Sequence, residues 1–203
     1  MKSLCRVWVL YLEENKIIVM VGIPGVGKTT LLSKIVEIIK KHGKSVHVVS
    51  FGTLMCEVAK KNGLSDRDEL RKLPITEQQN LQKLAAEKIA TLTEQVIIID
   101  THVFINSPGG YYPGLPENVL KIIKPTNFVS ISAKPEEIYN RRMKDDTRNR
   151  DKISVTNIKK ELDIQAGMIS ACSVITGSPV KFINNQEGKI DEISEKIINA
   201  IGV

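Results

Sequence analysis

The chain has 203 residues, a formal net charge of +6, 42% hydrophobic residues and 26% charged residues, as expected of an ordinary globular protein. Its basic residues are spread along the sequence and aromatic residues make up only 4%, which argues against nucleic acid as the main partner. No apolar stretch reaches the roughly 18–20 residues of a membrane span, and the cysteines lack the spacing of a disulfide framework or a zinc site. We therefore expect a single α/β domain in a reducing cytoplasm, without membrane attachment.

Strand-like and helix-like segments alternate along the chain, which predicts an α/β fold with a central five-stranded parallel sheet and helices on both faces. Residues 1–15 precede this pattern as an N-terminal extension of unknown role, and residues 16–203 form the predicted domain. The expected strands are the apolar runs Lys16–Val21, Ser45–Ser50, Gln95–Asp100, Asn127–Ser132 and Val180–Asn184.

Helical periodicity or helix-start signals occupy most of the segments between these strands. The expected helices are Thr29–His42, Leu54–Lys61, Thr76–Leu92, a helix opened by Pro135, Ser154–Cys172 and Ile190–Ile201. Thr76 is followed by Gln79 at the spacing of a capping box, so we expect Thr76 to cap its helix. A loop rich in glycine and proline is expected at Ser107–Pro116. Two segments, residues 51–92 and 142–152, are therefore expected to extend away from the sheet as excursions.

Residues 22–29 read Gly-Ile-Pro-Gly-Val-Gly-Lys-Thr and match the phosphate-binding pattern G-x-x-x-x-G-K-[ST] without a gap. The glycines let successive backbone N–H groups turn toward an anion, and the helix that follows adds its dipole. Lys28 is expected to reach the β- and γ-phosphates, and Thr29 to offer its hydroxyl to Mg²⁺. The motif therefore predicts that the chain binds a nucleoside triphosphate.

Asp100 ends an apolar, isoleucine-rich strand. In a doubly wound sheet this position lies at the edge where ligands collect, beside the phosphate loop. We therefore expect Asp100 to be a carboxylate on the magnesium side of the site, acting directly or through water. The alternative is an ordinary strand-end aspartate that caps a turn.

Arginines gather in the second excursion. Arg141, Arg142, Arg148 and Arg150 fall between residues 141 and 150. Guanidinium groups grip phosphate with two hydrogen bonds and spread positive charge, so this cluster suits a lid that closes over a phosphoryl group in transfer. The alternative is a solvated charged loop. Arg71, in the first excursion, either holds an acceptor phosphate or belongs to a surface helix.

From Lys16 onward the chain resembles the archaeal-type adenylate kinases over nearly its whole length. The matching stretches are Gly22–Thr30, Asp66–Pro74, Asp100–His102, Gly109–Pro116 and Thr147–Asp151. This resemblance implies a P-loop kinase fold with a helical AMP-binding excursion and a short lid without a zinc-binding insert. It also implies the reaction ATP + AMP ⇌ 2 ADP with Mg²⁺, by direct in-line transfer, in a homotrimer.

The resemblance also implies roles for individual residues. The catalytic residues would be Lys28, Asp100, Arg142, Arg148 and Arg150. The ATP side would be formed by Gly22, Ile23, Pro24, Gly25, Val26, Gly27, Lys28, Thr29 and Thr30, and the AMP side by Arg71, His102, Tyr112 and Gly114. Thr29 and Asp100 would hold Mg²⁺, partly through water.

One departure from the family pattern concerns the helix before the last strand. The pattern places an arginine about a dozen residues before a Thr-Gly pair, but residues 163–167 contain none. Loss of a charge-assisted contact to phosphate would slow transfer by one or more orders of magnitude. Either Lys159, Lys160 or Arg141 compensates, or the enzyme is slow or altered in substrate. Two alternatives thus stay open: a P-loop kinase for another small acceptor, and an RNA-associated nucleotide-binding ATPase.

Overall fold

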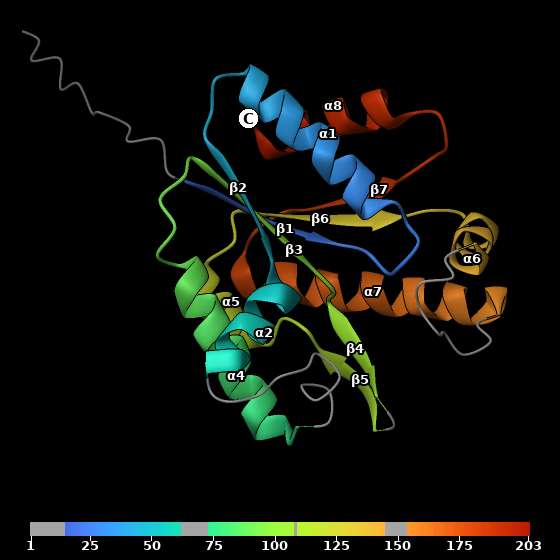
Figure 1. Ribbon diagram of the computed structural model, residues 1–203. Helices are drawn as coiled ribbons and strands as arrows, with labels where there is room; N and C mark the ends of the chain where they lie inside the picture. The colour runs from blue at the N-terminus through green and yellow to red at the C-terminus, as the bar shows by residue number, and fades with distance from the viewer. Residues whose placement is uncertain (1–14, 62–72, 108, 145–153) are drawn as a thin grey trace, which may run out of the picture.

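The computed structural model describes residues 15–61, 73–107, 109–144 and 154–203. Its centre is a five-stranded sheet in the order β2-β3-β1-β6-β7, and every neighbouring pair of strands is parallel (Figure 1). The strands are β1 (Lys16–Val21), β2 (Val46–Ser50), β3 (Val96–Thr101), β6 (Asn127–Ser132) and β7 (Val180–Asn184). The predicted sheet is confirmed, and the observed strand ends differ from the predicted ones by no more than one residue.

The sheet has two apolar faces because successive side chains of a strand point to opposite sides. On the central strand β1, Ile18 and Met20 enter one core and Val19 and Val21 enter the other. The first face is covered by α1 (Lys28–Lys41) and α8 (Ile190–Ile201) (Figure 1). The second is covered by α4 (Ile75–Ile89), α5 (Glu117–Ile123) and α7 (Val155–Thr176). Helices on both faces are therefore confirmed.

Two further helices lie beyond the carboxyl ends of the strands. α2 (Phe51–Lys61) follows β2 directly and packs on α4 through Ala59 and Leu81. α6 (Pro135–Met143) follows β6 and begins, as predicted, with a proline in its first turn. The predicted excursion 51–92 includes α2 and α4, and Arg142, the first residue of the predicted lid, belongs to α6. The outer limits of both excursions stay predictions.

The segment expected to be an irregular loop is in part an antiparallel hairpin. β4 (Phe104–Ser107) pairs with β5 (Gly110–Pro113), with Ile105 opposite Tyr112. The two strands contact each other through an edge-to-face pair of Phe104 and Tyr111, whose ring centroids lie 5.1 Å apart. Aromatic side chains favour such cross-strand packing, and here they outweigh the glycine and proline signals that predicted a loop.

The predicted capping role of Thr76 is wrong. The helix begins at Ile75 with Pro74 in the cap position, so Thr76 already lies in the first turn. Pro74 O accepts the backbone N–H groups of Glu77 and Gln78 at 3.0 and 3.1 Å. A proline before the first turn supplies a fixed φ, which starts the helix earlier than the capping pattern indicated.

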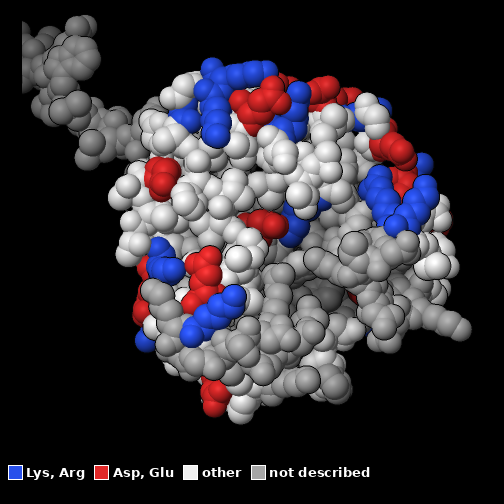
Figure 2. Space-filling model, viewed as in Figure 1, with Lys and Arg blue, Asp and Glu red and all other residues white. Residues whose placement is uncertain are grey.

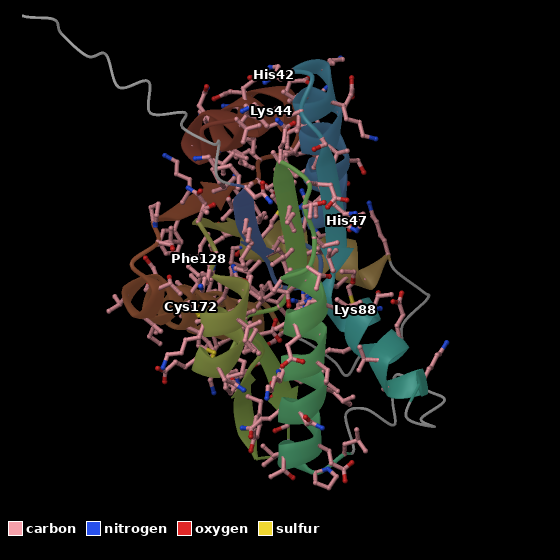
Figure 3. All side chains as sticks on the ribbon, turned by 90° about the vertical axis from the view of Figure 1, so that its left-hand side faces the viewer. His42, Lys44, His47, Lys88, Phe128 and Cys172 are labelled. Atoms are coloured by element: carbon pink, nitrogen blue, oxygen red, sulfur yellow. The ribbon has the colours of Figure 1, made fainter. Side chains whose placement is uncertain are left out.

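Charged side chains of both signs alternate over the face that α1 and α8 form (Figure 2). Lys34, for example, pairs with Glu37 at 3.8 Å and with Asp191 at 2.8 Å. On the edge strand β2, His47 Nδ1 lies 3.1 Å from Glu94 Oε1, on the outer surface of the sheet (Figure 3). Among the described residues, no helix has the length and apolar character needed to cross a bilayer.

Candidate active site

The phosphate loop joins the central strand β1 to α1, at the carboxyl end of the sheet. Gly25 and Gly27 have φ values of 89° and 83°, which few residues other than glycine adopt. At Gly22 the backbone is close to its neighbours, since an added Cβ would lie 2.7 Å from Val26 Cγ2. Gly25 and Gly27 are therefore favoured by the local backbone and Gly22 by tight packing, and α1 directs its N-terminus at the loop.

Side chains from outside the loop hold its carbonyl groups. Arg142 Nε donates to Pro24 O at 2.7 Å, and Arg141 Nη1 donates to Gly25 O at 3.3 Å. Asn185 Nδ2 donates to the next carbonyl, Val26 O, at 2.7 Å. Neither the contact of Arg141 with the loop nor that of Asn185 was predicted from the sequence.

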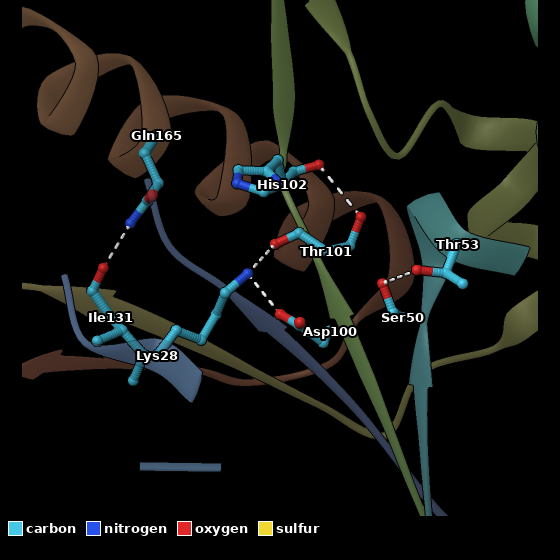
Figure 4. Close-up of polar contacts among 8 residues, drawn as sticks. All are labelled: Lys28, Ser50, Thr53, Asp100, Thr101, His102, Ile131 and Gln165. Atoms are coloured by element: carbon cyan, nitrogen blue, oxygen red, sulfur yellow. Dashed lines mark hydrogen bonds and ion pairs between the residues drawn. The ribbon is translucent and has the colours of Figure 1, made fainter. Parts of the chain in front are cut away.

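Lys28 bridges the loop and the end of β3 (Figure 4). Its Nζ lies 2.5 Å from Asp100 Oδ1 and donates to Thr101 O at 2.8 Å. Burial lowers the pKa of Lys28, and the neighbouring Asp100 carboxylate offsets this effect only in part. An ammonium group has three donors, so these contacts orient Lys28 and leave capacity for a phosphate oxygen. The structure thus brings together the two predicted residues Lys28 and Asp100.

The residues at this edge fit a magnesium ion that is held mainly by nucleotide phosphates. The Asp100 side chain as a whole is 28% exposed, although its Oδ1, the oxygen next to Lys28, is buried. Thr29 is exposed in the first turn of α1. No group of three or more His, Cys, Asp or Glu side chains in the described ranges is arranged to hold a metal. Magnesium in phosphate-transfer sites needs only one or two protein ligands, because phosphates and water supply the rest.

Of the residues predicted for the AMP side, the structure describes His102, Tyr112 and Gly114. His102 follows β3 immediately, and Gly114 packs so closely on it that an added Cβ would collide with His102 O. Gly114 N–H donates to Val103 O at 2.8 Å, which fixes the return of the β4–β5 hairpin. Tyr112 lies half-buried on β5. Arg71, Arg148 and Arg150 lie outside the described residues, and their roles stay predictions.

Arg142 has a second, buried partner. Its Nη2 lies 2.8 Å from Glu161 Oε2 on α7, and the two side chains are only 5% and 17% exposed. The arginine therefore joins the end of α6, the phosphate loop and α7. Glu161 was not predicted, because a single glutamate on a long helix gives no sequence signal.

The helix that lacks the expected arginine turns a glutamine inward. Gln165 is 2% exposed, and its Nε2 donates to Ser130 Oγ at 3.0 Å. The same Nε2 donates to Ile131 O, also at 3.0 Å (Figure 4). Among the basic residues considered as replacements, Lys159 and Lys160 are exposed on α7. Lys160 Nζ lies 5.9 Å from the centroid of the Tyr111 ring, on the hairpin of the predicted AMP side.

A parallel sheet of this order, with a glycine-rich phosphate loop after its central strand and a lysine facing a strand-end aspartate, defines a P-loop kinase fold. Shikimate kinases from Acinetobacter baumannii and Bacteroides thetaiotaomicron share this fold, with TM-scores of 0.57 and 0.60 at 14% and 12% identity. Their structures align with 93% of this chain, and the alignments cover 94% and 99% of their own chains.

Sequence relatives give the family. A family model described as an AAA domain matches residues 21–159. The adenylate kinase of Methanocaldococcus jannaschii is 42% identical over 93% of this chain and 99% of its own length. That of Thermoplasma acidophilum is 44% identical over 91% of this chain and 98% of its own. The chain belongs to the archaeal adenylate kinase family.

Proposed function

We propose that the chain catalyses reversible, Mg²⁺-dependent phosphoryl transfer, ATP + AMP ⇌ 2 ADP. The single observation that carries this proposal is the near-full-length likeness to adenylate kinases. The pairing of Lys28 with the strand-end carboxylate Asp100 supports it, because a triphosphate cradle of this geometry is what the reaction needs.

The transfer is direct and in line. An oxygen of the AMP phosphate attacks the γ-phosphorus, the bond to the bridging oxygen of ATP breaks, and ADP departs on the opposite side. Lys28 and the loop amides neutralise the β- and γ-phosphates, while Arg142, Arg148 and Arg150 are proposed to surround the group in transfer. No side chain forms a covalent intermediate, since AMP is already an anionic nucleophile, so positioning and exclusion of water carry the catalysis.

The acceptor side is proposed to hold AMP. Arg71 would bind its phosphate, and His102, Tyr112 and Gly114 would line the pocket. The close packing of Gly114 on His102 supports a shared surface at the end of β3. This is the edge where Asp100 and Lys28 meet, so an AMP phosphate there lies within reach of the γ-phosphate.

Magnesium is the proposed cofactor, with Thr29 and Asp100 as its protein-side partners, in part through water. When bound, it draws negative charge from the β- and γ-phosphates. The protein's contribution is a hydroxyl in the first turn of α1 and a carboxylate near the end of β3. Removal of the metal with a chelator should abolish ADP formation while leaving the fold intact.

A homotrimer and a cytoplasmic location are also proposed, both by family resemblance. Val174, Ile175 and Phe182 expose 84%, 53% and 52% of their surface, and such large apolar side chains would be covered in an oligomer. Analytical ultracentrifugation of the protein and of the variant Phe182→Lys tests the assembly. A monomeric wild-type protein at micromolar concentration would contradict it.

A coupled assay of ADP formation tests the activity. The protein is given Mg·ATP with AMP, CMP, UMP or GMP, and we expect formation of ADP with AMP and far slower reaction with the others. Lys28→Met serves as the inactive control. Absence of AMP-dependent ADP formation, with hydrolysis of ATP retained, would overturn the proposal in favour of another acceptor or of an ATPase.

A bisubstrate analogue, two adenosines joined through five phosphates, tests the geometry independently of turnover. If ATP and AMP occupy adjoining sites, the analogue should bind with one molecule per chain and far more tightly than ATP. Affinity equal to that of ATP would show that the second adenosine finds no site.

A further inference from the structure

Asn185 immediately follows β7 and is fixed from two directions. Its backbone N–H donates to Ser132 O at 2.7 Å, which continues the β6–β7 pairing by one residue. Its side-chain Nδ2 donates to Val26 O at 2.7 Å, across 159 positions of sequence. The side chain therefore ties the phosphate loop to the end of the edge strand β7.

The contact with Val26 O sets the direction of the next N–H group. A trans peptide unit holds its C=O and its N–H in opposite directions. Because Asn185 holds the Val26 carbonyl at 2.7 Å and the peptide unit is trans, the Gly27 N–H points away from the Asn185 amide. In the described part of the chain, this N–H has no protein partner. A backbone N–H that has no partner among the described residues can donate to a ligand oxygen.

The packing around Gly27 makes the arrangement specific. An added Cβ at Gly27 would collide with Asn185 Nδ2, so the asparagine side chain lies directly beneath this glycine. Gly27 also has a φ of 83° and takes the cap position of α1. The Val26–Gly27 peptide unit is thus held by a donor on one side and by the start of a helix on the other.

We propose that Asn185 is a positioning residue for the polyphosphate chain of the nucleotide. It keeps the Val26–Gly27 peptide unit in the orientation that directs the Gly27 N–H at a phosphate oxygen before the nucleotide binds. This inference rests on the proposed ATP site and adds a specific residue to it. Since the effect passes through the loop backbone, it concerns the phosphates and leaves the recognition of adenine and AMP unchanged.

Two substitutions in the full-length protein separate the donor from the space it fills. Asn185→Ala removes the donor, and Asn185→Asp keeps the shape but turns an acceptor toward the Val26 carbonyl. Calorimetric titration with ATP and with inorganic tripolyphosphate should show roughly tenfold weaker binding of both ligands for Asn185→Ala. The loss should be larger for Asn185→Asp. Steady-state kinetics should show a raised KM for ATP and an unchanged KM for AMP.

Asn184 offers the matched control, since it is exposed on β7 next to Asn185. Asn184→Ala and Asn184→Asp make the same changes of size and charge, and both should bind tripolyphosphate within about twofold of the wild type. Thermal unfolding without ligand reports on the fold of each variant.

Three results would overturn the inference. They are unchanged affinity of Asn185→Ala for tripolyphosphate, equal weakening of ATP and AMP binding, and weakening by the Asn184 variants as large as that by the Asn185 variants. Unchanged tripolyphosphate binding with weaker ATP binding would instead assign the side chain to the nucleoside. A wild-type protein that binds neither ATP nor tripolyphosphate would contradict the proposed ATP site itself, which the Asn185 comparison does not test.

Discussion

Lys28 Nζ and Asp100 Oδ1 lie 2.5 Å apart, and this ion pair joins the phosphate loop to the neighbouring strand β3. The lysine is the first residue of α1, and the aspartate lies opposite Met20 in the β1–β3 register. Parallel pairing of β1 and β3 therefore brings two residues that are far apart in sequence to the same edge. Burial lowers the pKa of Lys28 even so, because the loss of hydration exceeds the gain from Asp100.

This lowered pKa predicts proton uptake when ATP binds at alkaline pH. Phosphates favour the ammonium form, so the complex holds more protons than the free protein once pH approaches the pKa of the free Lys28. ATP affinity should then fall as pH rises through the lowered pKa of Lys28. Calorimetry in two buffers of different ionisation enthalpy measures the uptake. Lys28→Arg should show none, because a guanidinium stays protonated throughout; equal uptake by both proteins would contradict the assignment.

Because the ion pair of Arg142 and Glu161 is buried, we expect removal of one partner to lower the stability of the fold strongly. Arg142→Ala leaves Glu161 and Pro24 O without their partner in a buried position, and should lower the free energy of unfolding by about 3 kcal/mol. The double variant Arg142→Met/Glu161→Leu should recover most of this loss, since no unpaired charge remains buried. Urea unfolding provides the measurement.

Arg141→Ala is the matched control for that series. Its pair with Glu137 is 32% and 25% exposed and its hydrogen bond to Gly25 O is long, at 3.3 Å, so the substitution should cost less than about 1 kcal/mol. An equal loss of stability for both variants would show that the burial of the ion pair does not determine the cost of removing its arginine.

We expect the substitution of Gly167 by alanine to stabilise the protein. It lies exposed within α7, and an added Cβ would meet no atom within 4 Å. Gly167→Ala should raise the free energy of unfolding by about 0.5–1 kcal/mol, because alanine loses less backbone entropy in a helix. The melting temperature should rise by about 1–4 °C.

The same substitution at Gly177 should act in the opposite direction. Gly177 ends α7 with a φ of 72°, so alanine there is strained and should lower the melting temperature. A loss of stability in Gly167→Ala would contradict the assignment of this glycine to an open helix surface.

We expect an arginine introduced into α7 to raise the activity. Ala166 is half-buried beside the inward-facing Gln165, whose amide lies at the carboxyl end of β6. If the family contact to phosphate has been lost here, Ala166→Arg should raise kcat about tenfold or more. Ala171→Arg adds the same charge at an exposed position of the same helix and should leave kcat unchanged. An equal response of the two variants would show that the family position does not face the phosphates.

Strong local patterns predicted the framework of this protein. Apolar runs such as that of β1 identify buried parallel strands, and Gly22–Thr29 identifies the loop after it, because both signals are local. Asn185, Glu161 and Gln165 escaped prediction because their partners lie 159, 19 and 35 positions away. Their residue types are also common on exposed surfaces. Only the folded chain shows that Asn185 contacts the phosphate loop, that Gln165 contacts β6, and that Glu161 pairs with the arginine that holds the loop.

The strand order also sets how the chain can fold while it is being synthesised. β1 is the first strand of the sheet to leave the ribosome, but its neighbours β3 and β6 are completed only at Thr101 and Ser132. α8, which covers α1, ends at Ile201 of the 203 residues. The nascent protein therefore carries an apolar strand with at least one unpaired edge until residue 132 has been made. During that interval the unpaired edge of β1 makes the nascent chain prone to aggregation and a target for chaperone binding.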